Sequence, residues 1–267
     1  MRWIDMKWPD FEKTGSDTLL LWPLASCEQH GYHLPVGTDT YLVTEIAERI
    51  ERELPDTVVL LPTLWLGASH HHRAFPGTIS LPEGAYSSVL QEVIGGIVEG
   101  PVCAKGKVKR IFMLNGHGGN IYPGNSALSE LSWKYRDRPD IVIAFSSYWT
   151  AAEKAMSSAG LETDRLTHSC EYETSMMLAT RGELVQMDRA KALDVRWENT
   201  RFTPDASRAS DVSVAAPFHA RSANGALGSP ELGTEAKGEK LLDGITADLI
   251  DLVREMLRWP DLNDARK

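Results

Sequence analysis

The fold of this chain is decided by residues 27–39, which read CEQHGYHLPVGTD. The apolar run LLLWPL at residues 19–24 comes directly before them and predicts a buried strand over residues 18–24. From Asp39 to about Glu53, apolar residues recur at helical spacing, and Thr38-Asp39 is typical of a helix start. The segment therefore predicts a strand, a loop of polar side chains and a helix.

The same alternation continues along the chain. Further strands are predicted at residues 57–62, 109–114 and 141–145. Helices are predicted at residues 84–98, after residue 120, and at 168–178 and 235–259, with a short helical segment at 8–13. Residues 151–167 are predicted to be irregular in part, and residues 196–233, rich in Pro, Gly, Ser and Asn, are predicted to form long surface loops. This order predicts an α/β fold with a mostly parallel sheet flanked by helices on both faces. No linker divides the chain, so we expect one layered domain over residues 1–267.

Composition narrows the class of protein. Apolar residues make up 42% and charged residues 24% of the 267 residues, which is typical of a soluble globular protein. A net charge of −9 argues against nucleic acid or an anionic membrane as partner. Three cysteines at no zinc-finger spacing are typical of a reducing compartment. The polar N-terminus is unlike a signal peptide, and no apolar run approaches the ~20 residues of a membrane span. We expect a cytoplasmic protein that acts on a small molecule.

The loop after the first strand carries side chains that bind metals. Glu28 and His30 are two residues apart, so both project from the same side of an extended backbone, and Asp39 returns from the helix start. Ligands bind such sheets beyond the carboxyl ends of the strands. Two carboxylates and an imidazole there suit a divalent metal. The alternative is a polar surface loop in which Asp39 only caps the helix.

The turn NGHGGN at residues 115–120 follows the third strand and contains His117. Its glycines let the backbone turn sharply and approach a ligand closely. The turn lacks the spacing and the lysine of a P-loop, which argues against a phosphate site. Taken alone, His117 is also compatible with a buried, hydrogen-bonded loop histidine.

The segment HSCEYE at residues 168–173 places an imidazole and carboxylates about one helical turn apart. Glu171 is compatible with a simple role at the start of a helix, where acidic residues favour the dipole. Glu173 precedes the apolar residues 176–178, so we expect it to point into the interior. An unpaired charge is costly there, and a metal would satisfy it.

Together these motifs resemble the signature of the creatininase (creatinine amidohydrolase) family. They are residues 28–39, FPGT at 75–78, residues 115–120 and residues 168–175. They occur in the family's order between about residues 19 and 180, and residues 225–239 resemble its C-terminal region. The resemblance implies a creatininase-like fold and a hydrolase with two divalent ions per chain, zinc or manganese, assembled as a homohexamer.

The resemblance also implies a ligand set. Glu28, Asp39 and His117 would hold one metal, and His30, Glu173 and the shared Asp39 would hold the other. Two such ions ~3.5–4 Å apart lower the pKa of a bridging water, and the resulting hydroxide attacks a carbonyl. The expected substrate is a small cyclic amide or a formamide.

Two further residues match family positions near the substrate. His168 is expected to protonate the leaving nitrogen, because imidazole titrates in the working pH range. Trp149 is expected to close the site and exclude water. The chain departs from creatininase at Gly119, where that enzyme has a glutamate. The resemblance therefore does not imply activity on creatinine itself. His70-His71-His72 is also unlike the family loop; it is either a polar rim or the source of a substrate contact.

Three other classes of function are compatible with parts of the sequence. The same metal site would also serve a hydrolase of a carbocyclic, inosose-like ketone or a peptidase. A cysteine hydrolase built on Cys27 would lack an independent base and an oxyanion motif. A non-catalytic small-molecule-binding protein is disfavoured, because every implied ligand position holds a competent side chain.

Overall fold

The computed structural model describes residues 1–103, 107–163, 166–195, 201, 211–212, 214 and 216–262. At its centre lies a four-stranded sheet of strand order β2-β1-β3-β4, in which every pair is parallel. The strands are β1 (Leu19–Leu24), β2 (Val58–Leu60), β3 (Arg110–Asn115) and β4 (Val142–Ser147). The predicted parallel sheet is confirmed.

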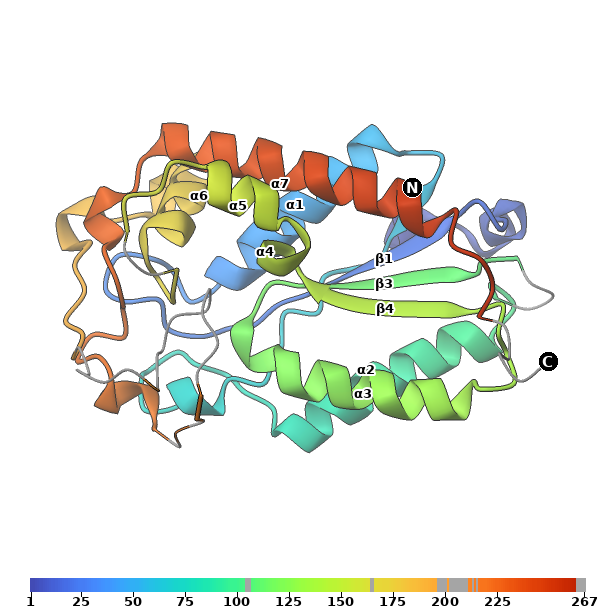
Figure 1. Cartoon of the computed structure of the whole chain (residues 1–267), viewed down its shortest axis with the longest axis horizontal. Coiled ribbons are helices and arrows are strands. Elements are labelled where there is room, and N and C mark those ends of the chain that lie inside the picture. The colour runs from blue at the N-terminus through green and yellow to red at the C-terminus, as the bar shows by residue number, and fades with distance from the viewer. Residues whose placement is uncertain are drawn as a thin grey trace.

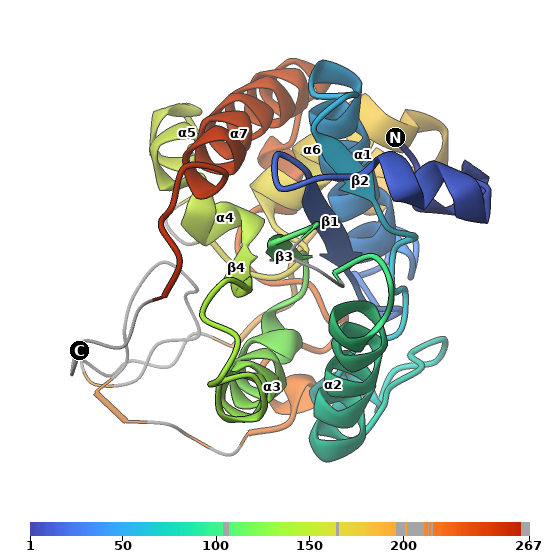
Figure 2. The ribbon, with the colours of Figure 1, turned by 90° about the vertical axis from the view of Figure 1, so that its right-hand side faces the viewer.

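Helices cover both faces of the sheet, as Figures 1 and 2 show. One face carries α1 (Thr38–Glu53), α4 (Tyr148–Ala151), α5 (Glu153–Ser158), α6 (Glu171–Arg181) and α7 (Glu235–Met256). The other carries α2 (Glu83–Glu99) and α3 (Ile121–Lys134). The α/β layered fold is thus confirmed. In the described part of the chain, no helix is long and apolar enough to cross a membrane.

The strand β1 separates two apolar cores. Leu19 and Leu21 pack into the core beneath α1, α6 and α7, whereas Leu20 and Trp22 pack into the core beneath α2 and α3. Successive side chains of a strand point to opposite faces, so a central parallel strand needs apolar residues at every position. All six residues of β1 are buried, which explains its continuous apolar sequence.

Some predicted elements differ from the observed ones. The strand predicted at residues 57–62 is confined to the edge strand β2. The helix predicted from His168 begins only at Glu171, because Ser169 has a φ of 58°, which a helix cannot contain. Residues 153–158 form the helix α5, and the predicted segment 8–13 is a 3₁₀ helix. The prediction for residues 196–233 falls partly outside the described residues.

Candidate metal centre

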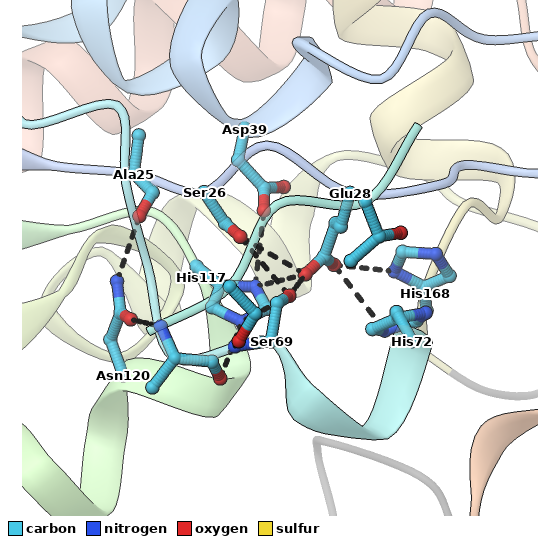
Figure 3. A network of polar contacts seen from close by, with 12 residues as sticks. Ala25, Ser26, Glu28, Asp39, Ser69, His72, His117, Asn120 and His168 are labelled. Atoms are coloured by element: carbon cyan, nitrogen blue, oxygen red, sulfur yellow. Dashed lines mark hydrogen bonds and ion pairs between the residues drawn. The ribbon is translucent and has the colours of Figure 1, made fainter. Parts of the chain in front are cut away.

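The candidate site lies beyond the carboxyl ends of β1 and β3. These strands are neighbours, and Leu24 is paired with Asn115 at their last positions. The two segments that follow therefore meet, which brings Glu28 close to His117 (Figure 3). Because α1 and α6 begin at the same edge, each contributes a carboxylate from its first turn: Asp39 and Glu173.

Asp39 occupies the middle of the site. Its Oδ1 lies 3.1 Å from His30 Nε2, and its Oδ2 lies 3.1 Å from His117 Nδ1. Glu28 Oε2 lies 3.2 Å from the same His117 nitrogen. Two groups of metal-ligand atoms result, each spanning no more than 4.8 Å: Glu28, Asp39 and His117 (the first triad) and His30, Asp39 and Glu173 (the second triad). All five side chains predicted as ligands thus lie together, and none belongs to a residue more than 5% exposed.

The donor atoms fit divalent cations. His30 Nε2 and Asp39 Oδ2 are buried and, apart from the 3.1 Å ion-pair contacts given above, have no hydrogen-bond partner within the described residues. Polar atoms are costly to bury without partners. The Nδ1–H group of His30 donates to the Glu28 carbonyl oxygen at 3.1 Å, which turns Nε2 toward the site. Imidazole nitrogens and carboxylate oxygens of this kind bind zinc and manganese.

Burial and neighbouring charges act in opposite directions on the pKa values of the cluster. Burial raises the pKa of Glu28, and it raises the pKa of Glu173 to about 7. Burial lowers the pKa of His30, but the adjacent Asp39 outweighs it and brings that pKa to about 9. Burial acts to raise the pKa of Asp39, yet His30 and His117 hold it well below its usual range. The imidazolium groups thus balance the charge of Asp39, a role that divalent cations would take if they displaced those protons.

Hydroxyl groups and a backbone carbonyl support the first triad. Ser69 Oγ donates a short hydrogen bond to Glu28 Oε2, and Ser26 Oγ donates to the same oxygen at 3.2 Å. His117 Nε2 lies 3.4 Å from the Ala68 carbonyl oxygen, so its Nδ1 is turned toward Asp39. Second partners of this kind fix the orientation of metal-binding side chains.

The asparagines of the NGHGGN turn hold the turn in place. Asn115 Nδ2 donates to the His117 carbonyl oxygen at 2.7 Å, and the His117 amide donates back to Asn115 Oδ1 at 3.1 Å. Asn120 donates to the Ala25 carbonyl oxygen at 3.0 Å and accepts from the Ala68 amide at 2.9 Å (Figure 3). The turn is therefore tied to the end of β1 and to the loop that carries the three consecutive histidines.

Glu173 of the second triad is supported differently. Tyr172 Oη donates to its Oε1 at 3.0 Å, and the Ser169 amide donates a short hydrogen bond to its Oε2. The left-handed conformation of Ser169 aims this amide at the carboxylate. Strain in the backbone of a residue other than glycine is typical of functional sites.

His168 lies in the turn before α6 and lines the same cavity as the triads. Its Nε2 donates to the Gln29 carbonyl oxygen at 2.8 Å, and its Nδ1 lies 3.5 Å from Glu28 Oε1. Burial lowers the pKa of His168 well below its ordinary value, so the imidazole is neutral. The Gln29 amide nitrogen in turn donates to His72 Nδ1 at 2.7 Å and to the Gly225 carbonyl oxygen at 3.2 Å.

The cavity above the triads has a volume of about 170 Å³. Trp149, the second residue of α4, forms part of its wall and also borders the neighbouring pocket. Phe218 lines it too, with its ring centroid 4.1 Å from that of His72 and 5.0 Å from that of His168. A cavity of this size admits a small substrate or one end of a larger one.

Several residues of the site were missed by sequence reasoning. Gln29 lies inside the motif of residues 28–39 and Ser69 directly precedes the three histidines, but nothing in their spacing predicts their contacts with His72 and Glu28. Phe218 lies in a segment predicted as a surface loop, and no sequence signal places its buried ring beside the histidines.

Comparison with known proteins agrees with this site. The sequence profile of the creatininase family, described as creatinine amidohydrolase, matches residues 4–253. The creatinine amidohydrolase of Pseudomonas putida is 26% identical, over 94% of this chain and 95% of the relative. A mycofactocin precursor peptide peptidase of Mycolicibacterium smegmatis is 29% identical, over 92% and 87%. A 3-dehydro-scyllo-inosose hydrolase of Thermotoga maritima is 31% identical, over 70% and 57%.

Solved structures of creatininases share the fold of this chain. A mutant creatininase complexed with creatine matches with a TM-score of 0.75 and 25% identity, over 97% of this chain and 99% of the other. A manganese creatininase matches with a TM-score of 0.74 and 25% identity, over the same shares. A mutant creatininase of the Zn–Zn type matches with 0.75 and 25%, over 97% and 98%. The chain belongs to the creatininase family and is a hydrolase with side-chain clusters suited to metal ions.

Proposed function

We propose that this chain is a binuclear-metal-dependent hydrolase that cleaves the C–N bond of a small cyclic amide or a formamide. The observation that carries the proposal is the position of Asp39, whose two oxygens face different histidines, His30 and His117, at 3.1 Å each. A carboxylate placed in this way would serve both candidate metal sites. Glu28 and Glu173 complete the two triads.

The chain supplies the charge balance that the reaction needs. The residues of the two triads would hold two divalent cations, whose chemistry would be to lower the pKa of water and to polarise a carbonyl. Three carboxylates, those of Glu28, Asp39 and Glu173, neutralise most of this charge and leave the site positive by one unit when the histidines are neutral. Because all three are buried, the remaining charge acts through little water and favours the negative oxygen that develops in the transition state.

His168 is the proposed proton carrier. Its Nε2–H is held by the Gln29 carbonyl oxygen, so Nδ1 keeps its lone pair and is the atom that can accept a proton. The side chain is 12% exposed and lines the cavity. His168 therefore takes a proton from the attacking water and passes it to the leaving nitrogen, which links the base step to the acid step.

Trp149 is proposed to limit the entry of water. It stands between the cavity above the triads and the neighbouring pocket of about 360 Å³. An indole in that position covers a substrate bound at the triads and strengthens the electrostatic interactions there.

The substrate class follows from the cavity and the relatives. Two of the three relatives described above are named for C–N hydrolysis, of creatinine and of a peptide, and the third for hydrolysis of an inosose. We do not propose creatinine: a Cβ on Gly119 would overlap the Ala68 carbonyl oxygen and lie 2.8 Å from His71 Cε1, so a glutamate does not fit there as the loop stands. A carbocyclic ketone or a peptide end is the second candidate, since either presents a carbonyl to the same triads.

Metal analysis followed by reconstitution tests the proposal. The purified protein is stripped with a chelator, reloaded with zinc or manganese, and assayed against cyclic amides, formamides, cyclic ketones and peptides. We expect two ions per chain and turnover that returns only with metal. A single ion per chain contradicts the binuclear site, and activity that survives the chelator indicates a thiol enzyme instead.

Replacement of His168 tests its role separately. We expect His168→Ala to keep two ions per chain and to lower kcat by about 10²- to 10⁴-fold, the usual contribution of a proton-transfer group. Because His168 also lies within ligand distance of Glu28 and His30, metal content must be measured alongside kcat. Loss of an ion would make His168 a ligand.

A further inference from the structure

The three consecutive histidines of the 3₁₀ helix His70–His72 have different surroundings. His70 is exposed, and its Nδ1 lies 2.7 Å from Ser80 Oγ. His72 is buried and uses both nitrogens: Nδ1 accepts from Gln29, and Nε2 lies 3.4 Å from Glu28 Oε1. His70 does not line the cavity, and both nitrogens of His72 already contact other side chains, so neither ring is placed to bind a ligand there.

His71 differs from both neighbours. It lines the cavity above the triads, and neither of its nitrogens makes a hydrogen bond or ion pair with a described residue. One of these nitrogens lies within 4.8 Å of ligand atoms on Glu28 and His72. An imidazole with free nitrogens therefore faces the space in which a substrate carbonyl would lie.

The ring of His71 is held in place by packing. It stacks on His117 with the centroids 5.8 Å apart and the planes 10° apart, and it contacts the ring of His72 at 4.3 Å. The backbone beneath it is closed by the hydrogen bond from the His72 amide to the Ser69 carbonyl oxygen, at 3.0 Å. Gly119 leaves room for the ring, because a Cβ there would lie 2.8 Å from His71 Cε1.

We propose that His71 contacts the substrate and selects amides that carry a second hydrogen-bonding group about two or three bonds from the scissile carbonyl. A neutral imidazole offers one donor and one acceptor, and here both are unused. With the carbonyl over the first triad, a polar group at that distance reaches the ring, whereas an apolar group leaves its nitrogens unpaired. Sites with buried polar groups discriminate strongly against analogues that lack the partner. The inference rests on the proposed metal-dependent function.

Hydroxamates test this inference without requiring turnover, since they bind metal ions directly. Acetohydroxamate reports on the metal site alone. N-acetylglycine hydroxamate adds a second amide, and 4-methylpentanohydroxamate has the same shape with a methyl group in place of the amide oxygen and a methylene in place of the amide N–H. Dissociation constants are measured by titration calorimetry on the zinc-loaded wild type, His71→Ala, His71→Gln and, as the matched control, His70→Ala.

We expect the preference for the acetylglycine compound over its apolar analogue to fall about tenfold in His71→Ala, which corresponds to one hydrogen bond. His70→Ala should keep the wild-type preference, and His71→Gln should keep part of it. Acetohydroxamate affinity, zinc content and thermal unfolding should be the same in all four proteins.

The possible outcomes distinguish a failure of this inference from a failure of the proposed metal-dependent function. If acetohydroxamate fails to bind the zinc-loaded wild type, the metal-dependent function itself is wrong. If it binds but His71→Ala keeps the full preference, the role of His71 is overturned. Loss of zinc in His71→Ala, or in His71→Gln should the alanine variant not fold, would make His71 a metal ligand rather than a substrate contact.

Discussion

The two triads share Asp39 but depend on different parts of the chain. In the first, Glu28 and His117 follow the ends of β1 and β3, which are hydrogen-bonded neighbours, and Asp39 stands in the first turn of α1. In the second, Glu173 comes from α6, which begins far along the chain after a turn with a left-handed residue. The sheet alone aligns the first triad, whereas the second also requires the docking of a helix.

The two glutamates are also supported by different parts of the chain. Glu28 is held by Ser26 and Ser69, whose hydroxyls lie beside it at the sheet edge. Glu173 depends on the placement of α6, which packs closely on α7: a Cβ on Gly238 would overlap the backbone of Ser175. The first triad is therefore positioned by strand ends and the second by helix packing. A substitution that weakens metal binding at one triad should leave binding at the other intact.

Replacing the shared residue should have the largest effect. We expect Asp39→Ala to lose both ions and to lower kcat/KM by more than about 100-fold, since even outer partners of metal ligands are worth 10- to 100-fold. Metal content per chain, measured by mass spectrometry, and kcat/KM check this. Two ions retained in Asp39→Ala would show that Asp39 does not bridge.

Replacing one glutamate at a time should separate the triads. Glu28→Gln removes a ligand charge only from the first triad and Glu173→Gln only from the second, so each variant should retain one ion per chain. The retained ion should stay bound at Asp39 with His30 in the first variant and with His117 in the second. Titration with zinc, followed by calorimetry, counts the sites. Loss of both ions from Glu28→Gln alone would mean that the second site cannot form without the first.

Local patterns predicted the parts of the molecule near the sheet. The apolar runs of β1 and β3 can only be buried strands, and polar residues after such strands must meet at one edge. Spacing alone nevertheless left Asp39 open as a helix cap. The assignment of five residues to two triads depended on the family resemblance, and the structure shows the required proximity.

The wall of the cavity could not be predicted in this way. Phe218 packs on His72 and His168 through contacts between distant segments, for which no local pattern exists. The helix start at His168 was wrong for a related reason. The hydrogen bond from the Ser169 amide to Glu173 favours a backbone conformation that helical periodicity cannot register.

Replacing the residues that support the glutamates should have smaller effects on metal affinity, each confined to one triad. We expect Ser69→Ala to weaken the ion of the first triad and Tyr172→Phe that of the second, by about 10-fold and at most 100-fold. Both substitutions remove only a hydroxyl group, so each is the control for the other. Competition with a metal-binding dye resolves the two affinities. Equal weakening of both ions in either variant would contradict separate support.

The last prediction concerns the stability of the metal-free protein and His33, which contacts Thr174 beside the second triad. Its Nε2 lies 2.9 Å from Thr174 Oγ1, next to Glu173, and burial lowers the pKa of His33 from 6.5 to about 4. The unfolded chain then binds a proton more readily than the folded one, so this stability is present above pH 6.5 and is lost as the pH falls toward 4. We expect the metal-free wild type to lose up to about 3 kcal/mol more than His33→Gln between pH 7 and 4. Urea unfolding of both proteins in chelator measures the difference, with His70→Gln as the exposed control. If His33→Gln loses as much stability as the wild type, His33 takes up a proton as readily in the folded protein as in the unfolded chain, and its contact with Thr174 does not depend on the neutral imidazole.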